Sequence, residues 1–248
     1  MNEKFINTKT IKESRQISSL IKVIIIDNDK TLDDIVLCIQ ALLANTNYEH
    51  LAISLYTNKL QALLSEISWI LDNKKIEIYY NERINCSLIL ASIQQSLVKY
   101  SGIVLLDTQA IVGQNWFKGI QQAAEREDVA VVVTREIRHR NDRLAWDLIP
   151  YAMNSSEIDI ALSEQNNCIL DPAFDEANLL VSINKLSLFC LYFKKNVLQR
   201  IDFGKFASED LNDWKTKVYS AISNEFKMNL VYTSKSKVFH SSFFNYVK

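Results

Sequence analysis

The sequence predicts a doubly wound α/β fold, in which helices cover both faces of a mostly parallel central sheet. Over the first 134 residues, apolar runs of strand length alternate with amphipathic helical segments, and the connections are short. Runs such as residues 23–26 and 103–106 are apolar throughout, as expected of strands that are covered on both faces. The chain of 248 residues holds only four glycines and two prolines, which favours long regular elements over a loop-rich all-β fold.

The composition is that of an ordinary globular protein, with 48% hydrophobic and 23% charged residues. A net charge of −1 provides no electrostatic reason to expect nucleic acid or an anionic membrane as a partner. No apolar run approaches the roughly 20 residues of a membrane span, and the polar residues 1–19 do not resemble a signal peptide. The four cysteines have neither zinc nor redox spacing. We therefore expect a cytoplasmic protein, either free or peripheral to the inner face of the membrane.

The first half of the chain contains the regular alternation of strands and helices. Residues 1–20 are expected to be a leader or a short helix, and the first strand, residues 22–26, ends at Asp27. Thr31 is a suitable N-cap for the helix that follows, over residues 32–43. The remaining elements expected in this half are a strand at 51–56, a helix at 60–71, a strand at 75–79, a helix at 84–99, a strand ending at 107, a helix at 117–125 and a strand at 129–133.

The alternation stops after residue 134. Residues 135–143 are densely charged and are expected to form a solvated loop, and residues 144–180 hold both prolines and little periodicity. Such a long connection is more often functional than not. The elements expected after it are a strand at 185–193, a short helix at 194–200, a turn at 203–204, a helix at 209–226 capped by Ser208, and two short strands at 229–232 and 237–240.

Residues 101–116 carry the functional hypothesis. The buried strand in this stretch ends on Asp107, and an ionised carboxylate is costly inside a sheet. Asp107 is therefore expected at the carboxyl end of the strand, where open α/β sheets bind ligands. The turn Asp107-Thr108-Gln109 follows, and a helix opens near Trp116. A carboxylate and an amide carbonyl are oxygen ligands of the kind that Mg²⁺ and Mn²⁺ prefer.

This stretch, with the residues that flank it, resembles the sugar-nucleotide-dependent glycosyltransferases of the GT-A type, family 2 in particular. In that family the strand ends in Asp-x-Asp, and the acids hold a divalent metal on the donor diphosphate; here the second acid is Gln109. The resemblance covers roughly residues 22–240 as a series of landmarks in the family's order. It implies a GT-A-like (Rossmann-like) α/β/α sandwich that forms a single domain over residues 21–248. Residues 21–134 would be the nucleotide-sugar-binding half and residues 135–248 the acceptor and catalytic half.

The resemblance also implies which residues bind the donor. Where the family carries acids after the second strand, this chain has Tyr56-Thr57-Asn58, whose ring and amide would contact the base. His240 matches a family histidine near the metal or the phosphates, and a neutral imidazole can bind a metal. The implied cofactor is Mn²⁺ or Mg²⁺, held by Asp107 and His240. The implied donor-binding residues are Asp27, Tyr56, Asn58, Arg83, Asp107 and Gln109.

The implied catalytic residues are Asp210 and Glu209, which match a Glu-Asp pair at a helix N-terminus. In inverting enzymes of the family the aspartate is the general base that takes the acceptor's proton. The structural alternative is that both acids only complement the dipole of the helix. The implied acceptor-binding residues are Trp146, Tyr151 and Trp214.

The predicted function is therefore transfer of a sugar from a nucleotide-diphosphate sugar to a saccharide, a lipid-linked glycan or a protein. A homo-oligomer or a partner glycosyltransferase is compatible with this function. The alternative is a GT-A-like protein that no longer transfers sugar and instead binds a glycan or scaffolds a partner enzyme, because acids of the donor side are missing. A nucleotidyltransferase is a weaker third possibility, since the first strand is not followed by a Gly-rich loop.

Overall fold

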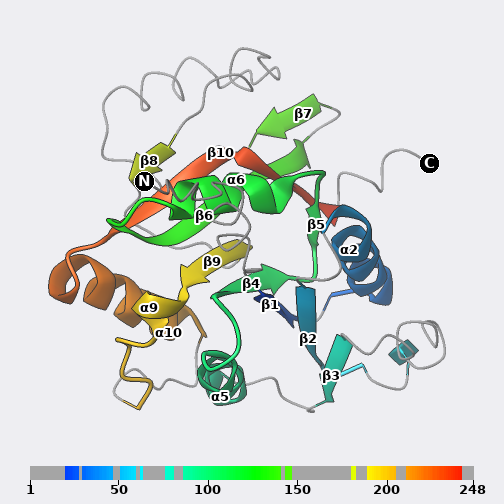
Figure 1. Ribbon diagram of the computed structural model, residues 1–248. Helices are drawn as coiled ribbons and strands as arrows, with labels where there is room; N and C mark the ends of the chain where they lie inside the picture. Colours follow the sequence, from blue (N-terminus) through cyan, green and yellow to red (C-terminus); the bar gives the residue numbers. More distant parts are fainter. Residues whose placement is uncertain are drawn as a thin grey trace, which may run out of the picture.

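The structure is a computed structural model that describes residues 20–27, 30–46, 51–59, 62–63, 76–80, 86–140, 143–146, 180–182, 189–204 and 211–241. Within these ranges, helices lie on both sides of a ten-stranded sheet (Figure 1). The strands are β1 (Ile21–Ile26), β2 (Leu51–Thr57), β3 (Ile76–Tyr80), β4 (Gly102–Asp107), β5 (Ala110–Val112), β6 (Val129–Arg140), β7 (Arg143–Trp146), β8 (Leu180–Ser182), β9 (Cys190–Lys194) and β10 (Asn229–His240). The helices are α2 (Leu32–Asn45), α5 (Cys86–Ser96), α6 (Trp116–Ala124), α9 (Lys195–Leu198) and α10 (Leu211–Ser220), which continues into a π-helical turn, Ala221–Glu225.

The sheet is mostly parallel, as predicted. Its strand order is β3-β2-β1-β4-β9-β6-β10-β5, with β7 added to β6 and β8 added to β10. Strands β1, β2, β3, β4, β6 and β10 run in one direction, and β9 is antiparallel between β4 and β6. Ile26 pairs with Tyr56 on one side and with Asp107 on the other, so β1, β2 and β4 end at the same edge. We call this edge the carboxyl edge.

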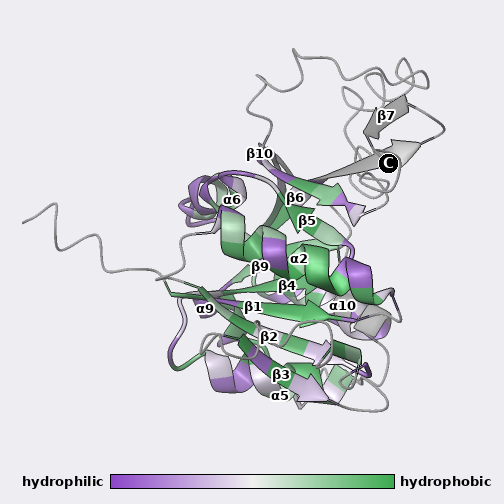
Figure 2. Cartoon of the chain, turned by 90° about the vertical axis from the view of Figure 1, so that its right-hand side faces the viewer, coloured by the Kyte–Doolittle hydropathy of each residue, from purple (hydrophilic) through white to green (hydrophobic). Residues whose placement is uncertain are grey.

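Two apolar clusters lie on the two faces of the sheet, because successive side chains of a strand point to opposite sides. Val23 and Ile25 pack with α2 and α6 on one face, whereas Ile24 and Ile26 pack with α5, α9 and α10 on the other. Strand β1 is buried along its whole length, and in Figure 2 it is drawn largely in green. This is the three-layer arrangement that a run of β-branched residues predicts.

Helix α2 begins where the sequence predicts it. Thr31 Oγ1 accepts a hydrogen bond from the N–H of Asp34 at 3.2 Å, and Asp34 Oδ2 accepts one from the N–H of Thr31 at 3.2 Å. This reciprocal capping box satisfies two N–H groups that a helix terminus leaves without partners.

The structure corrects two expectations for the second half. The charged residues 135–143, expected to be a solvated loop, continue β6 to Arg140, and β6 then pairs with β7. Arg135 is only 1% exposed. The two short strands expected at the C-terminus form one strand, β10, with register shifts between Asn229 and Leu230 and between Thr233 and Lys237. These segments form strands because β6 and β10 pair with each other, which a charge-rich pattern does not reveal.

Several predictions lie outside the described residues. They are the leader up to residue 19, most of the helix expected at residues 60–71, and the first part of the strand expected at 185–193, which is described only from residue 189 onwards. Strands β5 and β8 were not anticipated. Among the described residues, no helix is both long enough and apolar enough to cross a membrane.

Candidate active site at the carboxyl edge

Asp107 ends β4 at the carboxyl edge and begins a tight turn. Its N–H donates to the carbonyl oxygen of Phe189 at 3.0 Å, and its Oδ1 accepts from the N–H of Gln109 at 2.8 Å. An aspartate that accepts from the backbone two residues later stabilises a turn by its own side chain. The turn leads into β5, which pairs antiparallel with β10. The carboxylate of Asp107 is therefore held in orientation while the residue stays partly exposed.

His240 ends β10 beside this turn. It pairs with Ala110 of β5, and the N–H of the next residue, Ser241, donates to the carbonyl oxygen of Gln109 at 2.8 Å. The imidazole stacks on the ring of Phe189, with centroids 5.7 Å apart and an interplanar angle of 9°. We call Asp107, Gln109, Phe189 and His240 the Asp107 corner. Of its members, Phe189 was not predicted, because its role depends on a stacking contact between distant segments.

The Asp107 corner can hold a divalent cation only if the substrate and water supply part of its coordination. In the part of the chain that the structure describes, no group of three or more His, Cys, Asp and Glu side chains is placed to hold a metal. Asp107 and His240 would supply one carboxylate oxygen and one imidazole nitrogen, and Gln109 a neutral oxygen. Mg²⁺ is commonly held by one or two carboxylates together with substrate phosphates and water. The donor set therefore suits a cation that is completed by a diphosphate.

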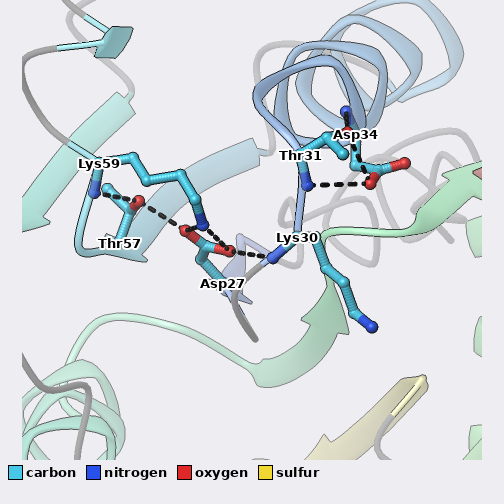
Figure 3. A network of polar contacts seen from close by, with 6 residues as sticks. All are labelled: Asp27, Lys30, Thr31, Asp34, Thr57 and Lys59. Carbon is cyan, nitrogen blue, oxygen red and sulfur yellow. Dashed lines mark hydrogen bonds and ion pairs between the residues drawn. The ribbon is translucent and has the colours of Figure 1, made fainter.

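Asp27, predicted to contact the donor, is instead a buried structural residue (Figure 3). Its carboxylate accepts from Thr57 Oγ1 at 2.8 Å, from the N–H of Lys30 at 3.1 Å, and from Lys59 Nζ at 2.9 and 3.1 Å. The side chain has no exposed surface. A buried carboxylate requires such partners, because its charge is otherwise too costly to desolvate. These contacts support a structural role for Asp27, and its direct contact with the donor stays a prediction.

Tyr56 is also less accessible than predicted. Its side chain is 4% exposed, and its ring stacks on Tyr79 with centroids 4.8 Å apart and an interplanar angle of 7°. Burial raises the pKa of the Tyr56 phenol above its usual value. Because Tyr79 covers one face of the ring, a base could stack only on the other face, and contact of Tyr56 with the donor stays a prediction. Asn58 follows β2 at the same edge and is partly exposed.

Trp214, predicted to bind the acceptor, lies in the core. Its side chain is 0% exposed, and its ring packs against Phe193 of β9 with centroids 6.1 Å apart. The aromatic residue therefore anchors α10 to the sheet, and its surface is not available to a sugar. Trp146 is the last residue of β7, opposite Ile137, and its side chain is outside the described part. The predicted residues Arg83, Tyr151, Glu209 and Asp210 also lie outside the described residues.

The thiol of Cys38 is buried next to the backbone of Asp107. Its Sγ lies 3.8 Å from the carbonyl oxygen of Asp107. Burial, and secondarily the charge of Asp107, raises the pKa of this thiol well above its usual value. Because the thiolate is the reactive form, Cys38 is an inert core residue.

A cavity of about 510 Å³ opens elsewhere, near the amino end of β4. Its described lining includes Ser101, Tyr192 and Lys195, and it contains none of the predicted site residues. The carboxyl edge, and not this cavity, is where the predicted residues Asp107, Gln109 and His240 meet.

Comparison with known proteins identifies the fold. No protein-family model matches the sequence, and no curated protein sequence matches it. Among solved structures, the chain is similar to GalNAc-T7 in a crystal structure with UDP, GalNAc and Mn²⁺, with 14% identity and a TM-score of 0.60 over 91% of this chain and 44% of that one. It is also similar to the mannosyltransferase PcManGT from Pyrobaculum calidifontis in complex with GDP-Man and Mn²⁺, with 10% identity and a TM-score of 0.57 over 89% of this chain and 56% of that one. The chain spans about half the length of these structures, and the likeness confirms the predicted GT-A-like fold.

Proposed function

We propose that this chain, which has the GT-A-like fold of nucleotide-sugar glycosyltransferases, transfers a sugar from a nucleotide-diphosphate sugar to an acceptor at the carboxyl edge. The observation that carries the proposal is the Asp107 corner, where the ends of β4 and β10 bring Asp107, Gln109 and His240 together. Support also comes from the two similar structures, one of which was determined with UDP, GalNAc and Mn²⁺ and the other in complex with GDP-Man and Mn²⁺. The acceptor class is a saccharide, a lipid-linked glycan or a protein, and the site of action is the cytoplasm.

The donor diphosphate would lie over the Asp107 corner, in the half of the chain formed by residues 21–134. Asp107 and His240 would hold Mn²⁺ or Mg²⁺ together with diphosphate oxygens and water. When bound, such a cation offsets the charge that develops on the leaving diphosphate. The N–H of Gln109 donates to Asp107 Oδ1 at 2.8 Å and so orients the carboxylate, which supports this placement.

The acceptor would be activated from the other half, residues 135–248. Asp210 is the proposed general base, with Glu209 in support, because loss of the acceptor's proton must accompany attack on the anomeric carbon from the face opposite the leaving group. Helix α10 begins at Leu211, directly after Asp210. The burial of Trp214 holds this helix against the sheet.

The test separates chemistry from binding. The Asp210→Asn variant is expected to lose transfer while it keeps nearly normal affinity for the nucleotide. The Asp213→Asn variant is the matched control, because Asp213 lies on the same helix, is exposed, and pairs with Lys217 at 2.8 Å. Full turnover by the Asp210→Asn protein would remove the residue from this role. Asp107→Ala should weaken metal-linked nucleotide binding. If the wild type gives identical nucleotide titrations with and without a chelator, the metal has no part in donor binding.

A second candidate function is a GT-A-like protein that binds a glycan or scaffolds a partner enzyme without transferring sugar. It is favoured by the amide at Gln109 and by the burial of Asp27, which leave the described donor side with few accessible carboxylates. Calorimetry against a panel of nucleotide sugars, with and without Mn²⁺, distinguishes the two. Absence of binding to every nucleotide would support the scaffold.

A further inference from the structure

Two lysines that the sequence-based hypothesis did not use lie at the carboxyl edge. Lys30 follows β1 and Lys59 follows β2, and the ends of these strands pair directly. Figure 3 shows both residues around the carboxylate of Asp27. Since ligands of open α/β sheets bind at this edge, each lysine is a candidate contact for an anionic ligand.

Lys59 is already used by the fold. Its ammonium lies 2.9 Å from Oδ2 and 3.1 Å from Oδ1 of Asp27, and its N–H donates to Thr57 Oγ1 at 3.0 Å. Thr57 in turn donates its hydroxyl to Asp27 at 2.8 Å. The charge of Asp27 is thus neutralised by Lys59, and the loop after β2 is tied to the end of β1.

Lys30 contributes only its backbone to this network. Its N–H donates to Asp27 Oδ1 at 3.1 Å, whereas its side chain extends away from the other five residues in Figure 3. Among the described residues, its ammonium takes part in no ion pair or hydrogen bond. The residue is only partly exposed. The backbone of Lys30 is therefore fixed at the carboxyl edge, while its ammonium forms no ion pair with a carboxylate of the described residues.

The neighbouring helix terminus does not offer an equivalent anion site. Helix α2 begins directly after Thr31, but its capping box uses the N–H groups of Thr31 and Asp34. Asp33 and Asp34 also place negative charge in its first turn. An anion at this point would meet like charges and few available N–H groups. Positive charge for a ligand beside β1 must therefore come from side chains.

We propose that the ammonium of Lys30 binds the diphosphate of the donor directly, and that the Asp27–Lys59 pair is a positioning element that holds the two loops beside it. This inference rests on the proposed function. The diphosphate of a nucleotide sugar is a dianion, and Asp107 adds a further negative charge at the same edge. A divalent cation alone leaves this group of charges negative, and Lys30 supplies the missing positive charge without requiring metal.

The experiment is calorimetry of the full chain with UDP and GDP, with the matching monophosphates and with the nucleosides, in Mn²⁺ and in chelator. Lys30→Ala should weaken binding of the diphosphate by about tenfold to a hundredfold in both conditions, as expected for a lost charge-assisted hydrogen bond. Binding of the nucleoside should not change, and Lys30→Arg should restore part of the loss. The matched control is Lys118→Ala, which removes an exposed lysine of α6.

Folding is checked separately. Lys30→Ala should unfold at nearly the same temperature as the wild type, because the side chain makes no hydrogen bond or ion pair with a described residue. Lys59→Met should unfold at a lower temperature, because it strands the buried Asp27. If the wild type binds a diphosphate and Lys30→Ala binds it equally well, this inference is overturned and the proposed function stands. If the wild type binds no nucleotide in either condition, the proposed function fails and takes this inference with it.

Discussion

The N–H of Ser241 donates a hydrogen bond to the carbonyl oxygen of Gln109 at 2.8 Å, which fastens the end of β10 to the turn after β4. Asp107 begins this turn and His240 directly precedes Ser241, so the hydrogen bond links the backbone segments that carry the Asp107 and His240 side chains. Phe189 links the same two segments a second time, because its ring stacks on His240 and its carbonyl oxygen accepts a hydrogen bond from the N–H of Asp107. Asp107 and His240 should therefore act as a unit.

The first prediction concerns this unit. In a double-mutant cycle with Asp107→Asn and His240→Ala, the two changes should be non-additive in their effect on Mn²⁺-linked nucleotide affinity. The expected coupling energy is about 0.5–3 kcal/mol, the range for residues that share a partner. The measurement is titration calorimetry of the four proteins with UDP or GDP. Strictly additive losses would mean that the two side chains do not serve the same ion.

The second prediction concerns the buried ion pair. Asp27→Asn should lower the free energy of unfolding by about 2–3 kcal/mol, somewhat less than the ~3–5 kcal/mol of fully buried pairs. The loss is smaller because the Lys59 side chain is 27% exposed and its stranded charge can be hydrated. Denaturant unfolding measures the change. The control is Asp213→Asn, whose exposed pair with Lys217 should contribute only about 0.3–0.5 kcal/mol. Equal losses from the two variants would contradict a structural role for Asp27.

The third prediction concerns the contact between α6 and β10. A Cβ at Gly119 would lie 2.7 Å from both the carbonyl carbon of Lys235 and the nitrogen of Ser236. Backbone atoms cannot move aside as a flexible side chain can, so Gly119→Ala should destabilise the protein by about 1–3 kcal/mol. On helix propensity alone the same change would stabilise by about 1 kcal/mol, so even the sign of the measured effect is informative. At Gly204 the nearest atom is a side-chain oxygen at 3.3 Å, and Gly204→Ala should change stability by no more than about 0.5 kcal/mol.

The fourth prediction concerns alkaline pH. Burial raises the pKa of Tyr192 from 10.0 to about 12. Because the pKa in the folded protein is above that of the unfolded chain, the contribution of Tyr192 to stability is complete below pH 10 and is lost as the pH rises towards about 12. Tyr192→Phe lacks this dependence. The stability difference between wild type and variant should therefore fall by about 3 kcal/mol across this interval. Parallel curves of stability against pH for the two proteins would show that the phenol is hydrated in the folded state.

Much of the first half of the fold could be predicted because its signals are local. An apolar β-branched run specifies β1, helical spacing specifies α2, and the Thr31–Asp34 capping box marks where that helix begins. The position of Asp107 at a strand end was also predictable, since charge is excluded from a sheet that is covered on both faces. These properties depend on neighbours within a few residues.

The sequence by itself determined the α/β class, the succession of strands and helices along the first half of the chain, and the presence of an acid at the end of β4. Only the tertiary structure decided that β9 lies antiparallel between β4 and β6, that the charged run after Thr134 continues a strand, and that Trp214 is a core residue. It also decided that Asp27 is neutralised by Lys59 and that His240 lies beside Gln109. The physical reason is that burial and ion pairing depend on contacts between segments far apart in the chain. Periodicity and capping report only the contacts that each segment makes with itself.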